Sequence, residues 1–324
     1  MSSSASISPV QPRVAAEASE IVGRLERQVA TVIRGKQEII RLAIVSLMAK
    51  GHLLIEDVPG VGKTTLARTL AKSMGLDFQR IQFTSDLMPS DILGVSVYRQ
   101  ESERFEFVPG PIFGNVVLAD EINRASPKTQ SALLEAMGEG RVSVDRESYE
   151  LQQPFIVLAT QNPLEYVGTF PLPESQLDRF MMSLKIGYPP KEEELGLLRS
   201  GGVEERLAAM EPAVSRAEVI QLQKQAAKIA VADKLAEYVL SIATATRTSD
   251  DFLLGVSTRG VQSMYRATQA MALCEGRRFA TPDDVQRVAL AVLSHRVALK
   301  GALGDIIAAG DAIERLIATI PVPI

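Results

Sequence analysis

Residues 57–65 read DVPGVGKTT, and this stretch decides the fold. An apolar run, Leu53–Ile55, precedes it, and apolar residues at helical spacing follow it at positions 66, 67, 70 and 74. A short strand, a glycine-rich turn that ends in Gly-Lys-Thr, and a helix form an arrangement that holds nucleotide phosphates. The sequence therefore predicts a phosphate-binding loop between a strand and a helix.

Most positions of this loop have a role in the predicted chemistry. Gly60 and Gly62 let the backbone approach a phosphate closely, so that loop N–H groups and the helix N-terminus face the anion. Lys63 supplies a positive charge for the β- and γ-phosphates, and the Thr64 hydroxyl suits Mg²⁺. Asp57 stands where the general pattern has its first glycine, which leaves the phosphate-contacting half intact. The predicted nucleotide-binding residues of the loop are Pro59, Gly60, Val61, Gly62, Lys63, Thr64 and Thr65.

The composition of the chain disfavours several classes of function. The 324 residues favour about two domains, and the net charge of −4 gives no electrostatic footprint for nucleic acid or anionic lipid. A single cysteine, Cys274, excludes an internal disulfide framework, and two histidines with it leave no usual metal cluster. We expect a reducing, cytoplasmic location, no membrane span, and a flexible tail over residues 1–16 that is not a secretion signal.

Two kinds of pattern divide the chain near residue 190. Before it, apolar strands such as 116–119 and 155–160 alternate with helices, which predicts a parallel sheet covered by helices. Two hairpins are expected in this part, over 91–98 with 104–108 and over 142–144 with 149–151. After it, the segments 192–200, 215–229, 231–247, 258–276 and 282–299 read as helices. The predicted fold is therefore α/β over 17–190, followed by an all-α lid domain over 191–324.

Two acidic residues and an amide follow the predicted buried strands. Asp120 at the end of one strand can hold Mg²⁺ through water, and Glu121 can act as general base on an attacking water. Asn162 after the next strand can orient that water without adding charge. An acid pair at a helix start and a turn asparagine before proline are the structural alternatives.

Two arginines are candidates for stabilising charge on a transferring phosphoryl group. Arg179 closes the predicted sheet domain, and Arg259 opens a predicted lid helix. Guanidinium groups stabilise such transition states strongly. Either residue alone is more often part of a surface ion pair, so spacing by itself is a weak signal.

With these elements in order, the chain resembles the AAA+ ATPases, and within them the MoxR family of the helix-2-insert clade. The resemblance covers residues 18–300 and rests on four motifs: LADEINRASPKTQSALLEAM at 118–137, ATQNP at 159–163, GTFPLPESQLDRF at 168–180 and TPDDV at 281–285. It implies a Walker A loop with Lys63 and Thr64, and a Walker B element with Asp120 and Glu121. It further implies that Asn162 is sensor 1 and that Arg179 is an arginine finger for a neighbouring subunit.

The same resemblance implies several further assignments. Arg259 matches sensor 2, residues 91–111 the helix-2 insert, and 141–153 the hairpin before sensor 1. Val32, Ile33 and Gly35 lie where such proteins wrap adenine. Members form ring hexamers that use ATP and Mg²⁺, often with a von Willebrand factor A domain protein, and are thought to act as chaperone-like remodellers or maturation factors. The two polar hairpin tips, 99–103 and 145–148, would then face a central channel or a client, although charge protection of strand edges also explains them.

Three alternatives remain open from the sequence. A DNA-translocating motor is disfavoured by the slightly acidic composition. A nucleotide-gated scaffold with little turnover is disfavoured by the intact Glu121 and Asn162. A chelatase-type motor subunit is a close relative that the sequence does not separate. The client, the partner, the number of subunits and the choice between cis and trans action for Arg259 are not determined.

Overall fold

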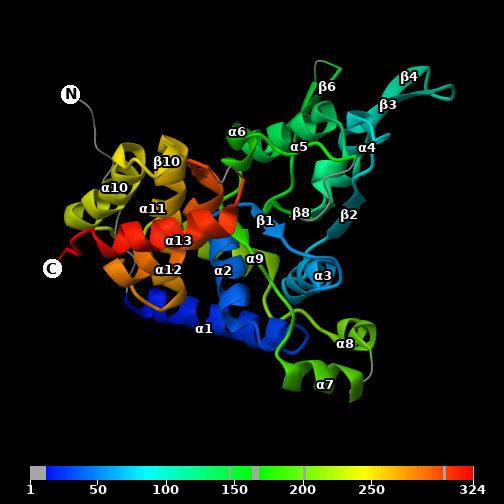
Figure 1. Ribbon diagram of the computed structural model, residues 1–324. Helices are drawn as coiled ribbons and strands as arrows, with labels where there is room; N and C mark the ends of the chain where they lie inside the picture. Colours follow the sequence, from blue (N-terminus) through cyan, green and yellow to red (C-terminus); the bar gives the residue numbers. More distant parts are fainter. Residues whose placement is uncertain (1–11, 146, 163–167, 200–201, 302–303, 324) are drawn as a thin grey trace, which may run out of the picture.

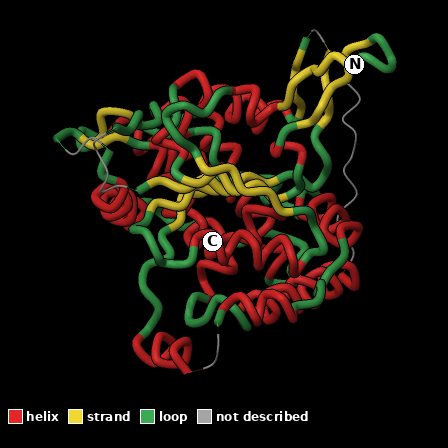
Figure 2. Tube along the Cα trace, turned by 90° about the vertical axis from the view of Figure 1, so that its right-hand side faces the viewer, coloured by secondary structure: helices red, strands yellow, loops and turns green. Residues whose placement is uncertain are grey.

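The protein is built around a five-stranded parallel sheet. The computed structural model describes residues 12–145, 147–162, 168–199, 202–301 and 304–323. The strand order is β2-β5-β8-β1-β9, and Figure 2 shows this sheet as a layer between helices. The strands are β1 (Leu53–Glu56), β2 (Phe78–Gln82), β5 (Val116–Asp120), β8 (Ile156–Gln161) and β9 (Met182–Leu184). The predicted parallel sheet is thus confirmed, and β9 is an edge strand that is too short to give a sequence signal.

Side chains of the central strands point alternately to the two faces of the sheet, and each face packs into its own apolar core. Leu53 and Ile55 of β1 face the core formed with α2 and α3, whereas Leu54 between them faces the core formed with α5. Successive strand residues point to opposite faces, so a fully apolar strand needs cover on both sides. The covering helices are α1 (Pro12–Ala30), α2 (Gln37–Met48), α3 (Lys63–Ser73) and α5 (Pro127–Glu139).

Two hairpins project from the sheet domain, at the upper right of Figure 1. They are β3 (Gly94–Arg99) with β4 (Arg104–Pro109), and β6 (Arg141–Val144) with β7 (Glu147–Glu150). The rings of Phe107 and Tyr149 stack with centroids 4.1 Å apart and join the hairpins. Arg146 at the second predicted tip lies outside the described residues.

The first hairpin differs from the prediction at its start. Residues 91–93 were expected in a strand but belong to α4 (Pro89–Leu93). Pro89 occupies the first helical turn, and the Asp91 carboxylate accepts a hydrogen bond from Met88 N at 2.8 Å, which closes a helix start. The strand begins only at Gly94, whose φ of 103° ends the helix in a conformation that a residue with a Cβ rarely adopts.

The remainder of the chain is mainly helical, as expected. Thr281 and Asp284 form the predicted cap of α12, with the Asp284 carboxylate accepting from Thr281 N at 2.8 Å. The expected helix over 282–299 ends at Leu293, where a 3₁₀ turn and a short strand follow, and helices α8 and α13 were not predicted. The elements are α6 (Glu174–Leu177), α7 (Lys191–Arg199), α8 (Val203–Ala209), α9 (Arg216–Ala226), α10 (Asp233–Thr248), β10 (Phe252–Leu254), α11 (Thr258–Cys274), α12 (Pro282–Leu293), η3 (Ser294–Arg296), β11 (Ala298–Leu299) and α13 (Ile306–Ala318), with η1 (Pro111–Phe113) and η2 (Ile122–Arg124) in the sheet domain.

The first helix is longer than predicted and contacts the lid. Residues 12–16 were assigned to a flexible tail, but α1 begins at Pro12 and Ala15 is fully buried; residues 1–11 lie outside the described part of the chain. Ser19 Oγ donates to Cys274 O of α11 at 3.1 Å, so the helix is anchored by a contact that the local sequence does not reveal. Within the described residues, no helix is both long enough and apolar enough to cross a membrane.

Candidate nucleotide site

The loop between β1 and α3 has the backbone that the sequence predicts. Gly60 and Gly62 adopt φ of 87° and 94°, a left-handed region that strains any residue with a Cβ. A Cβ added at Gly60 would meet no heavy atom within 4 Å, so the loop borders open space. Gly62 is the N-cap of α3, whose first N–H groups have no acceptor within the helix. This end of the helix can therefore receive an anion.

Asp57, the departure from the general motif, anchors the loop. Its side chain is buried, and its carboxylate accepts hydrogen bonds from Val58 N on Oδ1 at 2.8 Å and from Gly187 N on Oδ2 at 2.6 Å. Lys63 Nζ in turn donates to the Asp57 carbonyl oxygen at 2.6 Å. The aspartate thus ties the start of the loop to the segment that follows β9, a contact that glycine could not make.

The segment predicted to wrap adenine lies against the same region. Lys36 Nζ donates to Tyr188 O at 2.7 Å. Gly35 has a φ of 69°, and a Cβ there would come within 2.8 Å of Pro190 Cδ. Val32 and Ile33 are buried in the core that also contains Val61. Gly35 therefore lies beside the segment that Asp57 binds, Val32 and Ile33 are buried in the core, and the contact of all three with adenine stays a prediction.

Asp120 ends β5 with both carboxylate oxygens engaged. Oδ1 accepts from Thr160 Oγ1 at 2.7 Å, and Oδ2 accepts from Arg80 Nη2 at 2.6 Å and from Arg80 Nε at 3.1 Å. Arg80 comes from β2 and Thr160 from β8, the strands on either side of β5. The neighbouring strands thus fix the direction of this carboxylate.

Glu121 follows in a strained backbone conformation. Its φ of 57° and ψ of 49° are left-handed, which is uncommon for a residue with a side chain. Its N–H donates to Thr160 Oγ1 at 2.8 Å, and its Oε2 accepts from Gln82 Nε2 at 2.8 Å and lies 3.2 Å from Arg124 Nε. The single hydroxyl of Thr160 therefore sets the geometry of both acidic residues.

Asn162 completes the group at the carboxyl edge of the sheet. It follows β8 directly and is 6% exposed. Glu56 and Gln161 pair at the ends of β1 and β8, and Asp57 N donates to Gln161 O at 3.2 Å. Asn162 therefore leaves β8 at the same height along the sheet at which the loop leaves β1. The structure brings together the loop, Asp120, Glu121 and Asn162, as the sequence predicts.

The donor set at this edge suits magnesium. Thr64 lies in the first turn of α3 and Asp120 at the end of β5, and hydroxyl and carboxylate oxygens are ligands that Mg²⁺ accepts. Among the described residues no group of three or more His, Cys, Asp or Glu side chains could hold a metal ion. A magnesium ion here would therefore depend on nucleotide phosphates and water for most of its ligands, which is its usual mode.

Arg179 lies near the amino-terminal ends of β1 and β9, whereas the loop follows the carboxyl end of β1. Met182, the first residue of β9, pairs with Leu53, the first residue of β1, and Met181 N donates to His52 O at 2.8 Å. Arg179 precedes these pairs, so β1, which spans roughly 13 Å over its 4 residues, separates it from the phosphate loop. Its Nη1 donates to Leu134 O at 2.6 Å, on α5.

Arg259 lies with Arg179 and away from the loop. Its Nη1 is 3.8 Å from Asp178 Oδ2, and its side chain is 54% exposed. Asp178 is also bound by Arg296 of η3, whose Nε donates to Oδ1 at 2.9 Å. The two predicted arginines therefore share one edge of the subunit, and neither joins Lys63 and Glu121 within the same chain.

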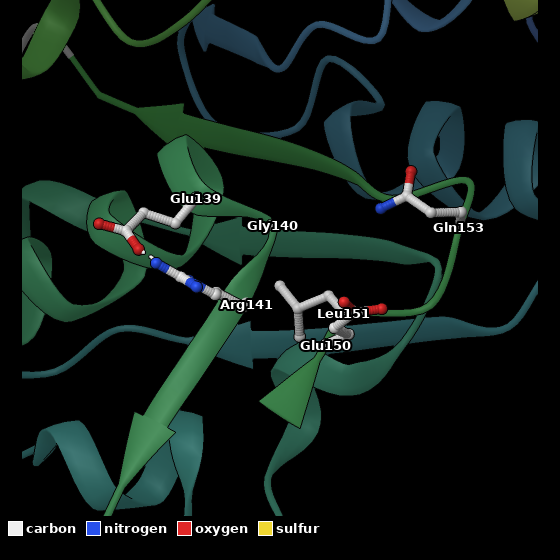
Figure 3. Close-up of a pocket in the computed structure, with 6 residues that line it drawn as sticks. All are labelled: Glu139, Gly140, Arg141, Glu150, Leu151 and Gln153. Carbon is white, nitrogen blue, oxygen red and sulfur yellow. Dashed lines mark hydrogen bonds and ion pairs between the residues drawn. The ribbon is translucent and has the colours of Figure 1, made fainter. Parts of the chain in front are cut away.

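Two hollows lie near these groups. Figure 3 shows one of about 570 Å³ at the base of the β6–β7 hairpin, where Glu139 and Arg141 point toward each other as an ion pair at 3.0 Å. The carboxylates of Glu139 and Glu150 make it a poor site for a phosphate. The other, of about 630 Å³, lies between β9, the start of the loop and the lid helices α12 and α13. There Ser183 Oγ donates to Glu56 at 3.0 Å, and burial raises the pKa of Glu56 to about 7.

Sequence reasoning missed five residues that shape these sites. Arg80 and Gln82 sit two apart on a predicted strand and so share a face, which is a signal for joint action on Asp120 and Glu121. Thr160 is the polar end of an apolar strand. Asp178 and Arg296 gave no local signal, because their pairing joins residues 118 positions apart.

Comparisons with known proteins agree with this geometry. The family described as "ATPase family associated with various cellular activities (AAA)" matches residues 52–182, and an AAA lid domain matches residues 244–316. Chaperone MoxR1 of Mycobacterium tuberculosis is 40% identical over 93% of this chain and 83% of its own length. An uncharacterised protein of Bacillus subtilis, YeaC, is 50% identical over 86% of this chain and 87% of its own.

A solved structure shows the same arrangement of both domains. A candidate ATPase from Cytophaga hutchinsonii superposes with a TM-score of 0.83 at 36% identity, covering 96% of this chain and 97% of that one. The similarity therefore extends over the sheet and the lid together.

Proposed function

Because this chain belongs to the MoxR family of AAA ATPases, we propose that it binds Mg-ATP at the Gly60–Thr64 loop and hydrolyses it inside a ring of identical subunits. The proposal of a ring rests on one observation. Arg179 and Arg259 lie at the edge of the sheet opposite to the loop of their own chain. An arginine that stabilises a phosphoryl transfer must touch it, so each nucleotide would meet the loop of one subunit and the arginines of the next.

The residues at the carboxyl edge support a hydrolytic mechanism. Lys63 and the loop N–H groups bind the phosphates, and Thr64 and Asp120 would hold Mg²⁺, which neutralises charge on the β- and γ-phosphates when bound. Glu121 removes a proton from the attacking water, and Asn162 orients that water. Thr160 fixes the two acids relative to each other, because its hydroxyl donates to Asp120 Oδ1 and accepts from Glu121 N.

Hydrolysis would be transmitted to a client through the hairpins. Loss of the γ-phosphate removes the contact with Arg179 of the next subunit and can shift the ring. The β3–β4 hairpin exposes Tyr98 and Phe105, which pack edge to face at 5.4 Å, and its Phe107 stacks on Tyr149 of the other hairpin. We propose a chaperone-like remodeller or maturation factor on this basis, working as a hexamer with a von Willebrand factor A domain protein.

A test of the hydrolytic site uses Glu121→Gln. This variant should bind ATP as the wild type does, by calorimetry with magnesium, yet release phosphate at least about a hundredfold more slowly, because the general base is lost. Full turnover would remove Glu121 from this role. Capture of proteins on the stalled variant in ATP would then identify partner and client.

A test of the shared site mixes two inactive variants. Lys63→Ala loses its own nucleotide but keeps Arg179, and Arg179→Ala keeps the nucleotide but loses the finger. Mixed rings should regain part of the wild-type activity at interfaces that combine an intact loop with an intact finger. No recovery, with mixed assembly shown by mass spectrometry, would exclude catalysis between subunits.

A scaffold with slow turnover is the second candidate. It is favoured by the engagement of both acids in the present geometry, Asp120 by Arg80 and Glu121 by Gln82. Steady-state phosphate release separates the two, since a scaffold binds ATP and turns over only when a partner is added. Partner and metal-insertion assays would separate the remodeller from a chelatase-type motor.

A further inference from the structure

A buried arginine of the lid holds the segment that carries Arg179. The Arg296 side chain is 1% exposed and lies in η3, which packs on α6 and β9. Its Nε donates to Asp178 Oδ1 at 2.9 Å, its Nη1 to Met181 O at 2.9 Å, and its Nη2 to the Phe180 carbonyl oxygen. The guanidinium therefore binds Asp178–Met181 along the backbone as well as through the carboxylate.

The chemistry of this contact is specific to arginine. Burial lowers the pKa of Arg296 to about 10, while the adjacent Asp178 carboxylate raises it, so the buried charge is compensated by one acid and several carbonyl oxygens. Further acceptors for Nη1 and Nη2 are Val292 O and Ser263 Oγ, the latter at 3.3 Å. Lysine would keep the charge but could not reach these divergent acceptors with one nitrogen.

The bound segment carries Arg179 and is linked to the helix that carries Arg259. Arg179 lies between Asp178 and Phe180 in the chain, and the Phe180 side chain is fully buried. The Asp178 carboxylate also accepts from Ser257 Oγ at 2.9 Å, and Ser257 caps α11 by accepting from Gly260 N at 2.9 Å. Arg259 lies in the first turn of that helix, and its Nη1 is 3.8 Å from the same carboxylate. Asp178 is therefore the common support of the Arg179 segment and the Arg259 helix.

We infer that Arg296, acting through Asp178, is a positioning residue that presents Arg179 and Arg259 as one unit to the nucleotide of the neighbouring subunit. The inference rests on the proposed function. The role of Arg296 is to lock the lid to Asp178–Met181, the finger segment, and not to touch the nucleotide. A change in the neighbour's nucleotide that moves Arg179 would then move the lid with it.

The principal variant is Arg296→Lys in the full-length protein. We expect kcat for ATP hydrolysis to fall at least about tenfold with KM for ATP changed less than about threefold, because the loop of the same subunit is intact. Arg277→Lys is the matched control. Arg277 is another lid arginine on an aspartate, Nη2 lying 2.5 Å from Asp284 Oδ1, but it does not touch the finger segment. Its kcat should stay near that of the wild type even if its melting temperature falls.

Mixing experiments separate positioning from general damage. Arg296→Lys subunits mixed with Lys63→Ala subunits should recover activity to the level of the Arg179→Ala and Lys63→Ala pair, since Lys63→Ala supplies a sound finger. Arg296→Lys mixed with Arg179→Ala should recover nothing, because both lack a working finger. A simple folding defect would give no such directional pattern.

A second variant covers the case in which a buried lysine prevents folding. Asp178→Asn with Arg296→Met removes both buried charges and should fold, yet show the same loss and the same directional rescue. Wild-type kcat in either folded variant, or recovery with Arg179→Ala, overturns the inference. If the Arg179→Ala and Lys63→Ala control pair itself stays inactive in mixed rings, the shared site fails, and the role of Arg296 fails with it.

Discussion

Arg80 donates two hydrogen bonds to one carboxylate oxygen of Asp120, from Nη2 at 2.6 Å and from Nε at 3.1 Å. This carboxylate, which we propose as a magnesium ligand, thus has a positively charged partner. Arg80 is half-exposed, so it can leave without breaking the core. Magnesium bound at Asp120 would therefore compete with Arg80 for the carboxylate.

Arg80→Ala should lower the magnesium concentration needed for half-maximal ATPase activity. The expected change is about two- to fivefold, because an ion pair with a half-exposed arginine is worth roughly 0.5–1 kcal/mol. Titration of MgCl₂ at fixed ATP measures it. Arg287→Ala, which removes a lid arginine paired with Glu38 and Glu275, is the control and should leave the curve in place. A higher magnesium requirement in Arg80→Ala would show that Arg80 assists the ion instead of competing with it.

Thr160→Val should separate the two acids from their common support. The change keeps the shape of a fully buried side chain but leaves Asp120 Oδ1 and Glu121 N without a partner, at a cost of about 1–3 kcal/mol in the free energy of unfolding. We expect kcat to fall roughly tenfold as the base loses its orientation. Steady-state phosphate release and urea unfolding measure the two effects.

Thr246→Val provides the matched control for this experiment. Thr246 is a buried lid threonine whose Oγ1 accepts from Val256 N at 3.0 Å. It should lose similar stability while kcat stays near that of the wild type. Equal kcat values for the two valine variants would mean that Thr160 acts only through stability.

Asp57→Asn should weaken ATP binding. The amide keeps the size of the side chain but has one acceptor oxygen in place of two, so it can accept from Val58 N or from Gly187 N and not from both. A loss of about tenfold in affinity corresponds to the roughly 1.4 kcal/mol expected for one such buried contact. Calorimetry with Mg-ATP is the measurement, with Asp77→Asn at an exposed position as the control. Unchanged affinity would mean that the link to Gly187 does not shape the loop.

Glu56→Gln should make the protein more stable at pH 8. The pKa of Glu56 is raised from 4.5 to about 7 by burial, so the folded state retains a proton that the unfolded state releases between these values. The favourable contribution of Glu56 to the free energy of unfolding is fully present below pH 4.5 and is lost as the pH rises through 7. The charged groups around this hollow are Asp57, Lys185 and Asp305, and none of them changes in the variant.

Unfolding free energies at pH 5 and pH 8 test this prediction. Glu56→Gln should gain about 1–3 kcal/mol over the wild type at pH 8 and little at pH 5. The pKa of His52 is lowered to about 4, and its effect has the opposite sign between pH 6.5 and 4, so only the difference between the two proteins isolates Glu56. A gain that is equal at both pH values would refute the titration.

Much of the fold followed from local sequence. The loop at 57–65, the buried strands and the cap at Thr281 were predicted because their signals lie within one element and its neighbours. The errors have local causes of their own. Asp91 closes a helix start where a strand was expected, and α1 begins at Pro12 because its first turns pack on the lid.

The candidate site residues also fall into two groups, those whose position followed from the sequence and those whose position only the structure gave. Lys63, Asp120, Glu121 and Asn162 lie at one edge of the sheet, since the carboxyl ends of parallel strands meet there, and their roles stay predictions. The sequence did not determine whether Arg259 acts in cis or trans, and its position beside Asp178 favours trans. The register between β1 and β9 places Arg179 at the amino-terminal ends of the strands, which no spacing along the chain reveals.

The sequence by itself determined the glycine-rich loop before α3, the acid pair after β5 and the helical lid, because the signal for each lies in a contiguous stretch of the chain. Only the tertiary structure decided their partners. Asp57 meets Gly187 at a separation of 130 residues, and Arg296 meets Asp178 at 118. The physical reason is that a buried polar group must find its hydrogen-bond partners wherever packing brings them, and packing joins segments that are remote in sequence.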